Sequence, residues 1–112
     1  MEISNQLEVE IKKFGKTVAH TGCFFSNGTV QVKDLFVREK FRSKGLADVL
    51  LTKIQEYADQ KRAEKIVAYC GPEPMCEDKS MPVEDQIAWY KSQGFIHDHD
   101  LYGVVPCMVK VL

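Results

Sequence analysis

The sequence predicts a mixed α/β fold, as a single domain over residues 1–112 in which one sheet packs with two helices. Three observations predict this fold class. Apolar and polar residues alternate near both ends of the chain, which is the period of half-buried strands. A long segment in the middle repeats its apolar residues at helical spacing. That segment lies between two segments typical of strands, and this order predicts a βαβ unit with parallel strands.

The first three strands are expected to form an antiparallel meander. Apolar and charged residues alternate over residues 7–12, and a turn that contains glycine follows at residues 13–16. A second strand is expected at about residues 17–25, and Ser26-Asn27-Gly28 forms the next turn. A third strand is expected over about residues 29–37.

The third strand contains an irregularity. Val30 and Val32 share one face, but Leu35 and Val37 have the opposite parity. A strand with one buried face switches parity only through an extra residue, so we expect a β-bulge near Lys33-Asp34. The alternative is that both faces of the strand are buried here, in which case parity carries no information.

The longest helix is expected from Arg42 to about Arg62. Its apolar stripe follows i, i+4 spacing at four positions: Leu46, Leu50, Ile54 and Ala58. The short apolar run Ile66–Cys70 is typical of a buried strand, and this strand would complete the βαβ unit.

The C-terminal part is expected to add a second helix and two strands. Residues 71–82 contain three prolines and a glycine, which predicts a loop. A short helix is expected over Val83–Gln93, and a strand begins at Phe95. The last strand runs over residues 105–111, where Pro106 indicates an edge strand or the start of a strand.

Composition excludes several classes of partner. The formal net charge is −1, so the chain has no general attraction to nucleic acid or to an anionic membrane. No window approaches the roughly 20 apolar residues of a membrane span, and the N-terminus lacks a signal pattern. We therefore expect a cytoplasmic protein with neither nucleic acid nor membrane as its partner.

The chain contains four cysteines, which show no C-x-x-C spacing: Cys23, Cys70, Cys76 and Cys107. A structural zinc site needs four nitrogen or sulfur ligands, usually paired at short spacing. His97 and His99 form only an isolated H-x-H pair, which is more typical of ordinary surface histidines. We expect reduced, mostly buried thiols, as is usual in the cytosol, and no metal site.

A phosphate-binding turn is predicted in front of the first helix. A strand end leads into a short basic loop that opens the helix, and a helix N-terminus offers unpaired N–H groups and a partial positive charge. Gly45 lets a phosphate approach the backbone, Ala47 keeps the next turn small, and Arg42 and Lys44 add charge-assisted contacts. The spacing is neither that of a Walker loop nor that of a dinucleotide fingerprint. The alternative is a helix start with ordinary surface lysines.

Two segments resemble motifs of the GNAT superfamily of N-acetyltransferases. Arg42-x-x-Gly45-x-Ala47 resembles the (Q/R)-x-x-G-x-(G/A) pyrophosphate motif, and Trp89-Tyr90-Lys91-Ser92-Gln93-Gly94-Phe95 resembles the family's (F/L)-Y-x-x-x-G-F stretch. They stand in the family's order, with the strand expected at residues 66–70 between them. The residues at 33–37 look most like those of polyamine and small-amine acetyltransferases. The likeness covers about residues 7–112.

The resemblance implies the GNAT fold and the use of acetyl-CoA, without a metal. Family members transfer the acetyl group directly to an amine, with no covalent enzyme intermediate. A bulge splays the third strand from the following parallel strand, and the pantetheine arm enters the gap. Carried over to this chain, the pantetheine contacts are backbone groups of Leu35, Phe36 and Val37. The pyrophosphate contacts fall on the turn and the first helical residues: Arg42, Ser43, Lys44, Gly45, Leu46, Ala47 and Asp48.

Tyr90 matches the tyrosine that protonates the departing CoA thiolate in many family members, so the resemblance implies a catalytic acid. The alternative is that its ring only packs beside Trp89 and Phe95. The general base is unassigned. Polyamine-type members carry a glutamate where this chain has Lys33, and Asp34 could act as the base through water or could be an ordinary surface residue.

The sequence therefore predicts an acetyl-CoA-dependent N-acetyltransferase that acts on a primary amine of a small molecule or a protein. The alternative is a catalytically weak acyl-CoA-binding or interaction module of the same fold. The likeness begins at the family's second strand, so we expect a homodimer partner or a large acceptor to complete the acceptor site. Acidic residues within segment 73–100 fit a cationic acceptor, or equally a solvated surface.

Overall fold

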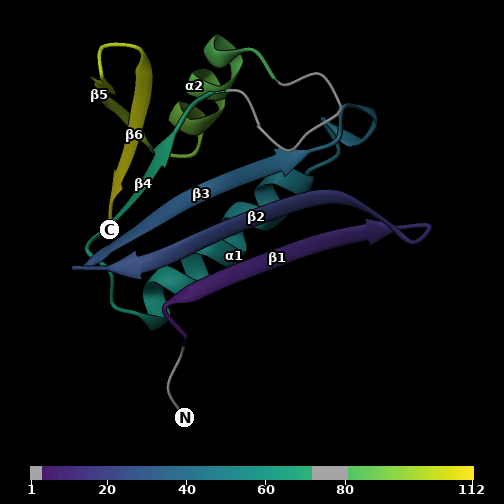
Figure 1. The fold of residues 1–112 in the computed structure, drawn as a ribbon, viewed down its shortest axis with the longest axis horizontal. Coiled ribbons are helices and arrows are strands. Elements are labelled where there is room, and N and C mark those ends of the chain that lie inside the picture. The colour runs from purple at the N-terminus through teal and green to yellow at the C-terminus, as the bar shows by residue number, and fades with distance from the viewer. Residues whose placement is uncertain (1–3, 72–80) are drawn as a thin grey trace.

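The computed structural model describes residues 4–71 and 81–112, and its six strands form one sheet in the order β1-β2-β3-β4-β6-β5 (Figure 1). The strands are β1 (Gln6–Lys13), β2 (Lys16–Ser26), β3 (Thr29–Val37), β4 (Lys65–Tyr69), β5 (Ile96–Leu101) and β6 (Val105–Val111). The helices are α1 (Leu46–Gln60) and α2 (Val83–Ser92), and a 3₁₀ turn covers Glu39–Phe41. The mixed α/β sheet with two helices is therefore confirmed.

The predicted meander consists of β1, β2 and β3, which pair antiparallel. A two-residue turn joins each hairpin. Phe14-Gly15 has φ angles of 53° and 76°, and Asn27-Gly28 has φ angles of 51° and 77°. Two consecutive residues in the left-handed region are typical of a type I′ turn, whose twist matches that of the flanking strands.

The predicted βαβ unit consists of β3, α1 and β4, since β3 and β4 pair in parallel. β6 lies between β4 and β5 and pairs antiparallel with both. The prediction that Pro106 marks an edge strand is therefore wrong, and its alternative, the start of a strand, is confirmed. Pro106 is the second residue of β6, where the ladder has few hydrogen bonds to lose, and its carbonyl accepts the Cys70 N–H at 2.9 Å.

α1 begins at Leu46, which is later than the predicted Arg42. The reason is the backbone of the preceding turn, where Ser43 has a φ of 62° and Gly45 a φ of 81°. Both values lie in the left-handed region, which a right-handed helix does not contain. Residues 42–45 therefore form a turn in front of the helix, with Gly45 as the N-cap.

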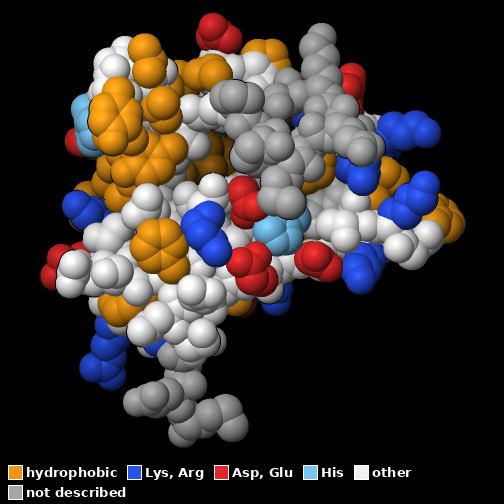
Figure 2. Space-filling model, in the orientation of Figure 1, with side chains coloured by type: hydrophobic (Ala, Val, Ile, Leu, Met, Phe, Trp, Pro, Cys, Tyr) orange, Lys and Arg blue, Asp and Glu red, His pale blue; other side chains and the backbone are white. Residues whose placement is uncertain are grey.

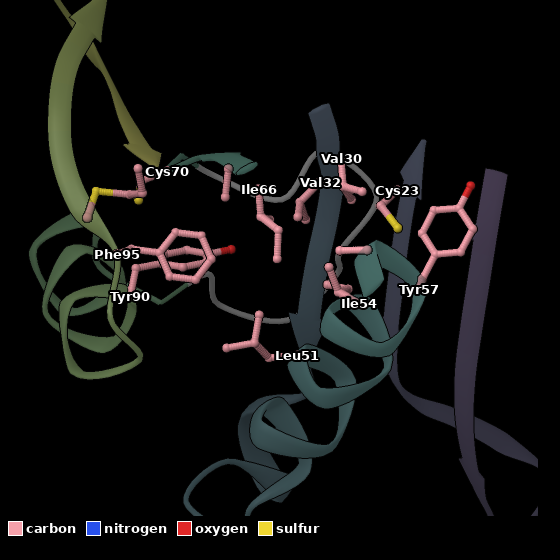
Figure 3. Close-up of a cluster of buried hydrophobic side chains, with 13 residues drawn as sticks. Cys23, Val30, Val32, Leu51, Ile54, Tyr57, Ile66, Cys70, Tyr90 and Phe95 are labelled. Carbon is pink, nitrogen blue, oxygen red and sulfur yellow. The ribbon is translucent and has the colours of Figure 1, made fainter. Parts of the chain in front are cut away.

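Both helices pack on the same face of the sheet. One hydrophobic cluster joins Leu51 and Ile54 of α1 to Tyr90 of α2 through strand residues that include Val32 and Ile66 (Figure 3). In Figure 1, α1 lies behind β1–β3, whose opposite face is turned toward the viewer. Neither of the described helices is long and apolar enough to cross a membrane.

The predicted β-bulge is confirmed at Lys33. Gly22 of β2 pairs with Asp34, while the next residue of β2, Cys23, pairs with Val32, so Lys33 is the extra residue. The apolar residues on the two sides of the bulge consequently face the same side of the sheet. The parity break in the sequence thus results from a change in the register between β2 and β3.

The described cysteines, Cys23, Cys70 and Cys107, are free and buried, as the sequence predicts. Cys76 lies outside the described residues. Burial raises the pKa of Cys23 and the pKa of Cys70 to about 11 in both cases. These two thiols are therefore protonated and unreactive at neutral pH.

Candidate functional site

A cleft of about 370 Å³ opens where β3 and β4 separate. The two strands pair in parallel only as far as Val32 and Ala68, and this pairing ends at the residue before the bulge. The second half of β3 forms one wall of the cleft, and the end of β4 and α2 form the other. One inserted residue therefore coincides with the opening of the cleft.

The second half of β3 turns a backbone edge toward the cleft. The N–H of Arg38 donates to a carbonyl of β2 at 2.8 Å, so the alternation of a strand directs the backbone groups of Phe36 toward β2 as well. Those of Leu35 and Val37 then point to the cleft side. The Nε of Arg42 donates to the Val37 carbonyl at 3.0 Å, which agrees with this direction. Of the three predicted pantetheine contacts, Leu35 and Val37 therefore turn backbone groups toward the cleft. The backbone groups of Phe36 bond to β2 instead.

The turn before α1 lies at the same cleft, which Arg42 and Ala47 border. The N–H of Val49 donates to the Gly45 carbonyl at 3.1 Å and is the first bond of the helix. The N–H groups of residues 45–48 therefore have no partner within the helix, and the N-cap residue, Gly45, has no side chain to cap them. This arrangement can bind an anion.

The remaining residues of the predicted phosphate site differ in their surroundings. Ser43, Lys44 and Asp48 are exposed. Asp48 Oδ1 accepts a hydrogen bond from Gln93 Nε2 at 3.3 Å, which connects the start of α1 to the end of α2. Leu46 packs its side chain into a hydrophobic cluster at the end of β3, so only its backbone is available to a ligand.

Tyr90 borders the cleft from α2. The residue is only 6% exposed, and its ring packs edge-on against Trp89 and Phe95, with centroids 4.9 Å and 5.1 Å away. Figure 3 shows the ring pointing from α2 toward side chains of β3 and β4. Tyr90 is thus both a core residue and a cleft residue.

Gln86 borders the cleft and was not predicted from the sequence. Its Oε1 accepts the Gly71 N–H at 3.0 Å, and its Nε2 donates to the carbonyls of Gly71 at 3.0 Å and Met81 at 2.8 Å. Gln86 therefore connects the chain that leaves β4 to α2. Its i, i+4 spacing from Tyr90 is the signal that could have found it, because the two residues share one face of α2.

Charged side chains gather beside the bulge, on the sheet face opposite α1 (Figure 2). His20 Nε2 lies 2.9 Å from Glu8 Oε2, and His20 Nδ1 lies 3.1 Å from Asp34 Oδ2. Asp34 Oδ1 accepts the Gly22 N–H at 2.6 Å, and Lys33 Nζ donates to Glu8 Oε1 at 3.2 Å. Desolvation acts to raise the pKa of Glu8, but the hydrogen bonds and charges of Lys33 and His20 lower it overall. We call Glu8, His20, Lys33 and Asp34 the bulge cluster.

The other two histidines lie on β5, and neither borders the cleft. His97 Nε2 is 2.6 Å from Asp100 Oδ1, and His99 Nδ1 is 2.7 Å from Asp98 Oδ2. Within the described parts of the chain, no group of three or more His, Cys, Asp or Glu side chains is arranged to hold a metal ion.

Solved structures of two acetyltransferases and of an anti-CRISPR protein share this fold. The PaiA N-acetyltransferase from Thermoplasma acidophilum, in complex with coenzyme A, superposes with a TM-score of 0.77 at 13% identity, over 96% of this chain and 62% of that one. A GNAT family acetyltransferase from Elizabethkingia anophelis with acetyl-CoA bound gives 0.72 at 16% identity, over 96% and 77% of the two chains. The anti-CRISPR protein AcrVA5 gives 0.70 at 19% identity, over 92% and 97%. The likeness at these identities is one of fold, and this chain spans less than two thirds of the Thermoplasma protein.

The family is shown by the sequence itself. No curated protein matches the chain significantly. The family model of the acetyltransferase (GNAT) domain matches residues 7–97, which contain both the turn before α1 and the Tyr90 segment. The chain therefore belongs to the GNAT superfamily of acetyltransferases.

Proposed function

We propose that this protein is an N-acetyltransferase that transfers an acetyl group from acetyl-CoA to a primary amine of a small molecule or a protein. The observation that carries the proposal is the cleft between β3 and β4, which combines a backbone edge with a helix N-terminus. These features match the two parts of acetyl-CoA, the amide-containing pantetheine arm and the pyrophosphate. Membership of the GNAT superfamily supports the proposal, as do the coenzyme A and acetyl-CoA bound to structurally similar proteins.

The backbone edge of β3 would pair with the pantetheine amides as a neighbouring strand does. The Leu35 N–H and carbonyl and the Val37 N–H face the cleft, whereas the Val37 carbonyl already accepts the bond from Arg42. An N–H on this edge would also polarise the thioester carbonyl, where negative charge develops during acyl transfer. Arg42 would act mainly by fixing the phosphate turn to the end of β3.

The turn before α1 fits a pyrophosphate group. A Cβ on Gly45 would meet no heavy atom of the described residues within 4 Å, which leaves space for a ligand beside this residue. Its φ of 81° is one that glycine adopts without strain. The N–H groups of residues 45–48 would supply the donors, and the exposed Lys44 would add positive charge.

Tyr90 would protonate the CoA thiolate as it leaves. Its position on the cleft wall supports this role, because a phenol acts as an acid only where its O–H reaches the sulfur. The edge-on contacts with Trp89 and Phe95 restrict the orientation of the ring. The packing role and the acid role are thus compatible in one residue.

Calorimetry with acetyl-CoA and a thiol-release assay together test the proposal. The assay follows release of CoA in the presence of spermidine, ethanolamine, tyramine or a lysine-containing peptide, and mass spectrometry identifies the acetylated amine. We expect acetyl-CoA to bind and CoA to be released only when an amine is present. Tight binding without release for any amine would contradict the proposal and favour the alternative, an acyl-CoA-binding module.

A further inference from the structure

We infer that the bulge cluster takes up the proton that the acceptor amine loses before it attacks, with Asp34 meeting the amine and His20 holding the proton. The inference rests on the proposed function and names the base that the sequence leaves unassigned. An amine is mostly protonated at neutral pH, and an ammonium has no lone pair. An amine acetyltransferase therefore needs a group that removes this proton.

Asp34 connects the cluster to the cleft. Lys33 and Asp34 both border the cleft, directly after the last pair between β3 and β4. His20 lies beside Asp34 on β2, where 26% of its side chain is exposed, compared with 35% for Asp34. A proton that the Asp34 carboxylate takes from the cleft can move to His20 Nδ1, which is 3.1 Å from Asp34 Oδ2.

The hydrogen-bond partners of His20 favour the uptake of one proton by its ring. Both ring nitrogens lie within hydrogen-bond distance of a carboxylate oxygen, but a neutral imidazole has only one N–H. The neutral ring can donate to Glu8 or to Asp34, whereas the imidazolium donates to both. Uptake of one proton therefore completes the hydrogen bonds of the cluster.

The charges around His20 also favour the uptake of one proton. Among the residues that the structure describes, the charged groups that face it are Glu8 and Glu10 from β1 and Lys33 and Asp34 from β3, and Glu10 forms its own ion pair within β1 at 3.8 Å. Since Lys33 offsets one of the two carboxylates of the cluster, the cluster carries one net negative charge when His20 is neutral. A proton on His20 neutralises the cluster.

The bulge and Gly22 together make the cluster possible. Gly22 pairs with Asp34 because of the extra residue, and without the bulge Lys33 would stand opposite Gly22 instead. A Cβ on Gly22 would lie 2.9 Å and 3.0 Å from the Glu8 carboxylate oxygens and 3.1 Å from Asp34 Oδ1. The Gly22 N–H occupies Asp34 Oδ1 and leaves Oδ2 for His20.

In the inferred step an N–H bond of the ammonium breaks, its electron pair stays on nitrogen, and the proton passes through Asp34 to His20. The amine lone pair then forms the C–N bond with the thioester carbonyl carbon, and the C–S bond breaks with its electron pair on sulfur. The thiolate takes a proton from Tyr90, and the second proton of the amine returns to the tyrosinate through water. His20 finally releases its proton to solvent, to which part of its ring is exposed.

The pH dependence of amine turnover in a His20→Gln variant tests the inference, with the best amine of the panel as the probe. Glutamine can hydrogen-bond to a carboxylate but cannot take up a proton. We expect kcat/KM for the amine at pH 7 to fall about 100- to 10,000-fold, while the affinity for CoA stays unchanged. The wild-type kcat/KM should have an acid limb that belongs to the enzyme, whereas kcat/KM of the variant should rise with the fraction of neutral amine and have the pH dependence of the amine alone.

His97→Gln is the matched control. His97 also contacts an aspartate on the sheet surface but does not border the cleft, so this variant should keep wild-type kinetics. Glu8→Gln tests positioning, because the imidazolium then loses one of its two anionic partners. We expect kcat/KM to fall about 10- to 100-fold and the acid limb to move to lower pH, which a purely structural role would not cause.

A His20→Gln protein with wild-type kcat/KM and an unmoved acid limb overturns the inference and leaves the proposed function standing. If the wild-type protein binds acetyl-CoA but releases no CoA with any amine, both are overturned. If His20→Gln misfolds and loses CoA affinity, the Glu8→Gln variant tests the inference in its place. An unmoved acid limb in Glu8→Gln then overturns the inference.

Discussion

The two halves of β3 have the same apolar character but different tasks. In the first half, Val30 and Val32 are 0% and 5% exposed, and the strand pairs with β2 on one side and β4 on the other. In the second half, Leu35 and Val37 lie in the same strand and still pair with β2, but their other edge borders the cleft. The difference begins at Lys33, the one extra residue.

The comparison shows how a small change of register creates a site without a change of composition. A bulge bends its strand, and β3 separates from β4 directly after Val32, so the backbone groups on that edge have no partner among the described strands. Such groups need hydrogen bonds from another source, and a ligand that contains amides can supply them. In this protein the core half stabilises the strand, and the second half offers its edge to a ligand.

The largest expected effect on acetyl-CoA affinity comes from Gly45→Glu, which changes the turn before α1 at the cleft and leaves the core half of β3 untouched. A carboxylate at the N-terminus of α1 would occupy the place of the pyrophosphate and repel it, so we expect the affinity for acetyl-CoA to fall roughly 100-fold or more in calorimetry. Gly15→Glu is the matched control, since Gly15 has a similar φ of 76° and an equally open Cβ position in the β1–β2 turn. Equal affinities of the two variants would remove the phosphate assignment.

Tyr90→Phe should leave the core intact and slow the chemistry. The ring contacts with Trp89 and Phe95 stay, so we expect kcat to fall about 10- to 1,000-fold while the ring keeps its place in the core. Tyr57→Phe serves as the control, because Tyr57 is a buried tyrosine whose hydroxyl donates to the Ser4 carbonyl at 2.7 Å, outside the cleft. If kcat is unchanged in Tyr90→Phe, Tyr90 is a packing residue.

Ile66→Val should have the reverse effect, because it changes a β4 residue that pairs with the core half of β3. Ile66 is fully buried on β4 and pairs with Val30. Loss of one methylene should lower the free energy of unfolding by about 0.5–1.5 kcal/mol in urea titration and leave acetyl-CoA affinity unchanged. A loss of affinity without a loss of stability would mean that the two halves of β3 are not separate in function.

The smallest expected effect is the contribution of the two buried thiols to the pH dependence of the free energy of unfolding. Burial raises the pKa of Cys23 and of Cys70 to about 11, whereas both thiols titrate at about 8.5 in the unfolded chain. The stability they contribute is present below about pH 8.5 and is lost as pH rises toward about 11, because the unfolded chain releases its protons first. Urea unfolding at about pH 8 and about pH 10.5 should show a smaller decrease in a Cys23→Ala/Cys70→Ala variant than in wild type. The same decrease in both proteins would contradict the raised pKa values.

The sequence was most informative where burial imposes a period. One-sided burial requires alternation, so the extra residue between Val32 and Leu35 disturbed the pattern visibly and the bulge could be predicted. The left-handed backbone of Ser43 leaves no such trace, because it depends on how the turn closes, and the start of α1 was placed too early. Pro106 was ambiguous because only the strand order decides whether a proline lies at an edge.

The bulge cluster could not be predicted for a related reason. It unites side chains from three strands, and their contacts depend on a register that the bulge itself shifts. Glu8, His20 and Asp34 are separated in sequence and belong to no motif. Only the paired strands bring the histidine between the two carboxylates.

Hydrogen exchange of the β3 amides, followed by NMR with and without CoA, tests the division of this strand most directly. The Val30 and Val32 amides should be protected in the free protein and change little when CoA is added. The Leu35 and Val37 amides should exchange faster in the free protein and become protected by CoA. Slow exchange of Leu35 and Val37 without CoA, or CoA protection that bypasses them, would contradict the claim that the bulge at Lys33 separates a core half from a ligand-binding half.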